Sequence, residues 1–127
     1  MKASDWKIGK RLRSFGYAFR GIGLLFSQPN ACIHAAVTVI VIVCGFLFGL
    51  SRMEWCVVAL CIGAVLMAEA FNTAVEAIAD KVSPGFDPLI GKAKDLAAGA
   101  VLLMVFGAVA AGLVIFLPKF IAFFSSL

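Results

Sequence analysis

The sequence predicts an all-α membrane protein with one surface helix and three transmembrane helices. Of its 127 residues, 63% are hydrophobic and only 14% are charged. A soluble globule of this size could not cover itself with so few polar side chains. Three apolar stretches are long enough to cross a bilayer, and the N-terminal stretch mixes basic and apolar residues instead. The length leaves room for a single domain, residues 1–127.

The surface helix is expected over residues 4–26. Its apolar side chains recur with helical spacing, at Ile8, Leu12, Phe15, Phe19 and Ile22. Basic side chains lie among them: Lys7, Lys10, Arg11, Arg13 and Arg20. This pattern is typical of a basic amphipathic helix that lies at the membrane interface. The Gly-rich stretch that follows has no cleavage site of small residues, so we expect no cleavable signal peptide.

The transmembrane helices are expected over residues 31–50, 54–81 and 96–117. The first follows a turn at Pro29 and is 20 residues long, about 30 Å as a helix. A polar turn at 51–54 separates it from the second helix. Two prolines and a glycine in residues 83–88 end the second helix, and residues 89–95 form a polar approach to the third. We expect the third helix to end near Pro118, before an apolar tail.

Basic residues predict the orientation in the membrane. Nine of them lie in the N-terminal segment and in residues 81–95, and only Arg52 and Lys119 lie on the opposite side. The N-terminus and the second turn should therefore be cytoplasmic, in the inner (cytoplasmic) membrane. The net charge of +4 favours membrane phosphates as its partner rather than nucleic acid, because the basic residues flank apolar spans.

A polar stripe marks the C-terminal third of the second transmembrane helix. Glu69, Asn72, Thr73, Glu76 and Asp80 fall within an arc of about 100° on a helical wheel. Three carboxylates in apolar surroundings are costly unless they bind a metal, pair with a cation or take a proton. The alternative, a solvated helix face, would carry Lys and Arg as well. The stripe therefore indicates a functional site.

The stripe and the turn that follows it contain the parts needed for phosphoryl transfer. Carboxylates can hold Mg²⁺ or act as a base, and Lys94, next to Asp95, can contact phosphates. The sequence has no GxxxxGK[ST] loop, which excludes a P-loop site. A proton-coupled transporter or channel component using Glu69 is the rival hypothesis, although it would not need the charges near Lys94. A non-catalytic scaffold would not need the stripe at all.

The motif E-A-F-N-T-A-V-E over residues 69–76, with Asp80 and the later Lys94-Asp95 pair, resembles a known family. It is similar to the small prokaryotic integral-membrane lipid kinases, which comprise diacylglycerol kinase and undecaprenol kinase. Residues 14–21 and 30–34 add to the resemblance, which covers roughly residues 10–117. It implies a homotrimer whose active sites are shared between neighbouring subunits. It also implies transfer of the γ-phosphate of Mg-ATP to the primary hydroxyl of a membrane lipid alcohol.

The resemblance also implies roles for single residues. Glu69 would be the general base for the lipid hydroxyl, and Glu76 the main protein ligand of Mg²⁺, with Gln28 as a second candidate. The expected nucleotide-binding residues are Tyr17, Asn72, Glu76, Asp80, Gly91, Lys94 and Asp95. The expected lipid-substrate residues are Lys10, Arg13 and Ala98.

Two positions depart from the family pattern, and two questions stay open. The family commonly has Glu where this chain has Gln28, so either the metal site is weaker or Gln28 binds the metal through its carbonyl oxygen. The family commonly has Arg where this chain has Cys32, which removes a cation from the interface. His34 fits either a packing role or contact with substrate or lipid headgroup. The sequence does not distinguish diacylglycerol from undecaprenol as the lipid, because both are long apolar chains that end in a primary hydroxyl. The His34 region, Ala98 and the Phe-Asn-Thr-Ala form of the motif slightly favour undecaprenol.

Overall fold

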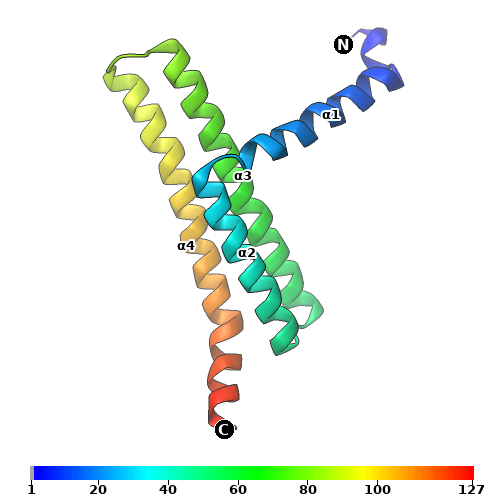
Figure 1. Ribbon diagram of the computed structural model, residues 1–127, viewed down its shortest axis with the longest axis vertical. Helices are drawn as coiled ribbons and strands as arrows, with labels where there is room; N and C mark the ends of the chain where they lie inside the picture. Colours follow the sequence, from blue (N-terminus) through cyan, green and yellow to red (C-terminus); the bar gives the residue numbers. More distant parts are fainter. Residues whose placement is uncertain (1) are drawn as a thin grey trace.

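The fold is a bundle of long helices with an extended N-terminal arm (Figure 1). The computed structural model describes residues 2–127, apart from the side chains of residues 4 and 5. A short 3₁₀ helix, η1 (Ala3–Trp6), precedes four α-helices: α1 (Ile8–Leu25), α2 (Pro29–Phe48), α3 (Arg52–Val82) and α4 (Pro88–Ser125). The helices α2, α3 and α4 are each long and apolar enough to cross a membrane. Three membrane-crossing helices, as predicted, make this a multi-pass membrane protein.

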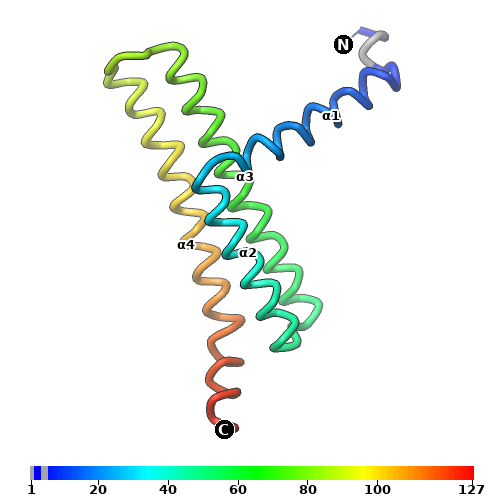
Figure 2. Tube along the Cα trace, in the orientation of Figure 1, coloured from blue at the N-terminus to red at the C-terminus, as the bar shows by residue number. Residues whose placement is uncertain are grey.

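The helix α3 lies at the centre of the arrangement. It contacts α1, α2 and α4, and it forms a long antiparallel hairpin with α4. The helix α2 lies along the N-terminal half of α3, whereas α1 leaves the bundle and extends away from it (Figure 2). A small core of Leu50, Val58 and Ile115 holds α2, α3 and α4 together. Large apolar side chains such as Phe106 (61% exposed) cover the outside, as expected where lipid or a neighbouring subunit replaces water.

The turn between α2 and α3 is short because both helix ends are capped. Gly49 ends α2 in the left-handed region, at φ 64°, which glycine adopts without strain. Ser51 Oγ then accepts from Glu54 N at 3.2 Å, and Ser51 N donates to Glu54 Oε1 at 3.0 Å. This capping box starts α3 immediately after the turn, which keeps α2 antiparallel to α3.

The helix α4 begins earlier than predicted. Asp87 Oδ1 accepts hydrogen bonds from Leu89 N at 2.9 Å and from Ile90 N at 3.1 Å, and Pro88 occupies the first helical position. An N-cap Asp followed by Pro is a start signal for a helix, since the missing N–H of Pro has no partner there anyway. The prediction that residues 89–95 form a polar approach to a helix starting at 96 was therefore wrong.

The helix α4 also ends later than predicted, because it continues through Pro118 to Ser125. Proline removes only one backbone hydrogen bond, and membrane helices tolerate the loss when neighbouring contacts hold the segment. Here Lys119 Nζ lies 3.1 Å from Glu54 Oε1. The ring of Phe48 also lies 5.9 Å from that of Phe120 and 6.1 Å from that of Phe123, centroid to centroid. The expected helix end near Pro118 was wrong for this reason.

The N-terminal helix differs from the single helix predicted over residues 4–26. Lys7, with φ −64° and ψ 129°, is extended and separates η1 from α1. The guanidinium of Arg11 lies 5.0 Å from the centre of the Trp6 ring and links the two pieces. Of the α1 side chains only Leu25 is buried, so α1 exposes both its basic and its apolar faces. Its position at a membrane interface stays a prediction.

Candidate functional site

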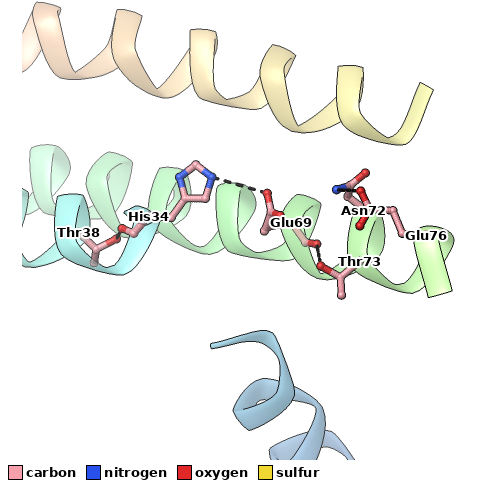
Figure 3. Close-up of polar contacts among 6 residues, drawn as sticks. All are labelled: His34, Thr38, Glu69, Asn72, Thr73 and Glu76. Atoms are coloured by element: carbon pink, nitrogen blue, oxygen red, sulfur yellow. Dashed lines mark hydrogen bonds and ion pairs between the residues drawn. The ribbon is translucent and has the colours of Figure 1, made fainter. Parts of the chain in front are cut away.

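The polar stripe of α3 changes from buried to exposed along the helix. Glu69 is 3% exposed and Asn72 is 6% exposed, whereas Glu76 and Asp80 are exposed. Figure 3 shows Glu69 between His34 on one side and Asn72 with Glu76 on the other. Thr73 turns its hydroxyl back onto the Glu69 carbonyl at 2.9 Å, so it does not reach into the site.

The buried end of the stripe faces α2. His34 Nε2 lies 3.6 Å from Glu69 Oε2, an ion-pair distance that is longer than a hydrogen bond. Thr38, one turn along α2, donates from Oγ1 to the His34 carbonyl at 2.8 Å. His34 belongs to the second turn of α2, about 7.5 Å along the axis from the start of that helix at Pro29. Glu69 of α3 therefore lies level with the second turn of α2. The α2 N-terminus thus places an imidazole beside the buried carboxylate.

The middle of the stripe has an unpaired buried oxygen. Asn72 Nδ2 donates to Glu76 Oε1 at 3.3 Å. Its Oδ1 is buried and has no hydrogen-bond partner among residues 2–127. A buried acceptor without a partner calls for an explanation, such as a ligand that donates or coordinates there. This oxygen and the Glu76 carboxylate, one helical turn apart, form a pair of hard oxygen donors.

The exposed end of the stripe faces α4. Lys94 Nζ donates to Asp80 Oδ1 at 2.8 Å. Because α4 begins at Pro88, the predicted residues Gly91, Lys94, Asp95 and Ala98 lie on one helical face rather than on a loop. Lys94 and Asp80 were both expected in one site, and the α3–α4 hairpin brings the two charges into contact.

Other predicted site residues lie on α1 and at the start of α2. Gln28 caps α2, and its Nε2 lies 3.5 Å from Ser27 Oγ. Tyr17 is 68% exposed on α1, the arm that also carries Lys10 and Arg13 away from the bundle (Figure 1). In the described part of the chain, no three His, Cys, Asp or Glu side chains gather to hold a metal ion. The pairing of Gln28 with Glu76 around a metal stays a prediction.

An apolar cavity that the sequence did not predict lies between α2, α3 and α4. Its volume is about 220 Å³, and it extends from His34 to Phe116. Valine, isoleucine and alanine side chains make up most of its wall, and Thr38 and Cys61 add the other polar atoms. The signal that could have found it is the run of small and β-branched residues on α4, but only the packing of three helices encloses the space.

These features form a polar face on a helix long and apolar enough to cross a membrane, with a buried carboxylate at one end and exposed charges at the other. A family model, prokaryotic diacylglycerol kinase, matches residues 16–116. The chain is 40% identical over 114 residues to undecaprenol kinase of Bacillus subtilis, which covers 89% of this chain and 93% of that protein. It is 35% identical over 125 residues to diacylglycerol kinase of Synechocystis sp., covering 96% of this chain and 71% of that protein. The chain belongs to the prokaryotic diacylglycerol kinase family and is a lipid kinase.

Proposed function

We propose that this lipid kinase transfers the γ-phosphate of Mg-ATP to the primary hydroxyl of a membrane lipid alcohol, undecaprenol or diacylglycerol. The observation that carries the proposal is the change from buried Glu69 to exposed Glu76 along one helix face. A reaction between a lipid and a water-soluble nucleotide needs such a face, because one reactant arrives from the bilayer and the other from water. Undecaprenol is the first lipid to test, since 40% identity extends over 93% of an undecaprenol kinase.

Glu69 is the general base in this proposal. It lies near the start of α2, at the depth where a lipid hydroxyl would reach the protein if α1 rests on the membrane surface. Its carboxylate takes the proton as the lipid oxygen bonds to the γ-phosphorus and the bond to the ADP oxygen breaks. Glu76 lies seven residues further, about 10.5 Å along the axis, on the aqueous side.

The outer part of the stripe would bind the nucleotide. The Glu76 carboxylate and the unpaired Asn72 Oδ1 fit Mg²⁺, which prefers oxygen ligands and binds through one or two carboxylates plus substrate phosphates. When bound, Mg²⁺ would neutralise charge that develops on the phosphates. Lys94, held by Asp80 at 2.8 Å, would turn its ammonium to the phosphates, and Asp95 and Gly91 lie on the same face of α4.

A homotrimer would complete the site. The α1 arm carries Tyr17, Lys10 and Arg13 away from its own stripe (Figure 1), and the apolar outer faces of α2 and α4 are exposed. In a trimer, a neighbouring α1 could supply Tyr17 to the nucleotide and Lys10 and Arg13 to the lipid headgroup, with Ala98 on α4 beside the lipid. The neighbouring subunit would also bring its Gln28 to the Mg²⁺ bound at Glu76.

The charge distribution supports the proposed orientation. Nine basic residues on the side of the N-terminus and the α3–α4 turn favour a cytoplasmic location for this side, in the inner membrane, where ATP is available. The alternative of a proton-coupled transporter using Glu69 has no support beyond that carboxylate, since the chain belongs to a kinase family.

The test is a phosphorylation assay with the purified protein in mixed micelles. Undecaprenol or diacylglycerol is supplied with Mg-ATP carrying a labelled γ-phosphate, and label in the lipid is measured. Glu76→Gln should abolish transfer without loss of the folded protein, because it removes the negative charge and keeps the side-chain volume. Transfer to neither lipid, or full turnover by Glu76→Gln at saturating Mg²⁺, would contradict the proposal.

A further inference from the structure

Glu69 is a charged group in an environment that disfavours charge. Its side chain is only 4% exposed, and among the described residues it is the one buried acidic side chain. A buried carboxylate usually has a charged or hydrogen-bonding partner, since its desolvation is otherwise costly. Within the described residues, the basic group within 4 Å of it is His34, at 3.6 Å.

His34 is placed between this carboxylate and more accessible space. Its side chain keeps 21% exposure, and it also lines the cavity of about 220 Å³. Around it, α3 contributes the titratable groups Glu69 and Cys61, whereas the cavity-lining residues of α4, such as Val105 and Ala108, are uncharged. The imidazole thus contacts one acidic partner and retains an open side.

We propose that His34 is a positioning residue that acts through Glu69 and receives its proton. The inference rests on the proposed function, in which Glu69 is the base. During transfer the lipid O–H bond breaks, the lipid oxygen bonds to the γ-phosphorus, and the bond from phosphorus to the ADP oxygen breaks. The proton goes to Glu69, passes from Oε2 to Nε2 of the neutral imidazole, and leaves from Nδ1 to water on the exposed side of His34. Glu69 is then ionised again and ready for the next lipid.

The experiment compares His34→Ala with the wild-type enzyme in the same micelles. Without the acceptor, Glu69 loses its proton slowly, so kcat should fall at least about 10-fold, but by less than the roughly 10²- to 10⁴-fold loss expected when the general base itself is removed. KM for Mg-ATP should not change, because the proposed nucleotide-binding end of the stripe begins at Glu76, seven residues along α3 from Glu69. Added imidazole should enter the space left beside the cavity and restore part of kcat.

The pH dependence of this rescue separates proton transfer from packing. Only neutral imidazole can accept a proton, so the rescued rate should rise from about pH 6 to about pH 8. Pyrrole has the same shape without a basic nitrogen and should restore nothing. Val41→Ala enlarges the same cavity from the same face of α2 and is the matched control, with wild-type kcat and no response to imidazole.

Other variants keep the inference falsifiable. His34→Gln keeps a side chain of similar reach that cannot take the proton, so it should be as slow as His34→Ala; a fast His34→Gln enzyme would overturn the relay. So would an unchanged kcat in His34→Ala, or a folded, slow His34→Ala enzyme that imidazole does not restore. The double variant that combines His34→Ala with Glu69→Gln should be no slower than Glu69→Gln alone, because His34 acts only through Glu69. If Glu69→Gln itself keeps its turnover, the base assignment fails, which is a different result from failure of His34 alone.

Discussion

Lys94 of α4 donates to Asp80 of α3 at 2.8 Å, and this ion pair joins the two helices near the turn that connects them. The side chains are 40% and 69% exposed, respectively. Exposed ion pairs contribute only about 0 to 1 kcal/mol to stability. The pair adds little to stability, but it holds the Lys94 ammonium beside the exposed end of the stripe, where the charge of Glu76 also acts on it.

We therefore expect Lys94→Ala to impair nucleotide use far more than folding. Loss of a hydrogen bond to a charged phosphate costs about 1.5 to 3 kcal/mol, so kcat/KM for Mg-ATP should fall about 10- to 150-fold. The melting temperature in detergent should stay close to that of the wild type. Lys92→Ala, an exposed lysine in the same part of α4, is the control and should keep its kcat/KM. An equal fall in kcat/KM for both variants would mean that nucleotide use depends on the total positive charge of this region and not on Lys94 itself.

A second prediction concerns Gln28. If a neighbouring subunit brings Gln28 to the metal, a carboxylate there should bind Mg²⁺ more tightly than an amide does. Gln28→Glu should lower the Mg²⁺ concentration that gives half-maximal rate, measured at fixed ATP. Gln28 is the N-cap residue of α2, but its side chain accepts no hydrogen bond from the helix, so the substitution should not disturb the fold. An unchanged or higher Mg²⁺ requirement would place Gln28 outside the metal shell.

A third prediction tests how closely α2 packs on α3. A Cβ added at Gly45 would lie 2.5 Å from Trp55 Cη2 and 3.1 Å from Leu50 Cδ1. The Trp55 ring has little room to move, because Phe46 packs against it at 4.9 Å between centroids. Gly45→Ala should cost about 1 to 3 kcal/mol through overpacking and lower the melting temperature in detergent.

Two variants serve as controls for that substitution. A Cβ at Gly63, on α3, would meet no atom within 4 Å, so Gly63→Ala should leave the melting temperature unchanged or raise it. Trp55→Phe removes the part of the ring that clashes and should recover part of the stability lost in Gly45→Ala. A fully stable Gly45→Ala protein would mean that α2 and α3 can separate at little cost.

Local patterns predicted most of the fold, and contacts between distant segments escaped prediction. Apolar length identified α2, α3 and α4, and the spacing of Glu69, Asn72, Glu76 and Asp80 identified the stripe, since both depend on helical period alone. The bounds of α4 were wrong because Asp87-Pro88 was read as a break rather than a cap, and Pro118 as an end. The contact of His34 with Glu69 depends on how α2 docks on α3, 35 residues along the chain, and no local signal encodes that.

The last prediction is that Glu69→Gln loses catalysis but still binds ATP. Glu69 lies about 10.5 Å along α3 from Glu76 and is buried beside His34, so it should meet the lipid hydroxyl rather than the nucleotide. Loss of a general base typically costs about 10² to 10⁴ in rate, and glutamine keeps the size of the side chain. We expect kcat to fall by that range while ATP affinity, measured by binding of a fluorescent nucleotide analogue, hardly changes.

Glu76→Gln provides the comparison for this result, because it should weaken Mg-ATP binding as well as turnover. The two variants therefore separate the lipid end of the stripe from its nucleotide end. If Glu69→Gln lost ATP binding as severely as Glu76→Gln, both carboxylates would act on the nucleotide, and the proton acceptor would have to be another group. If Glu69→Gln kept its turnover, the buried carboxylate would serve packing with His34 and not proton transfer.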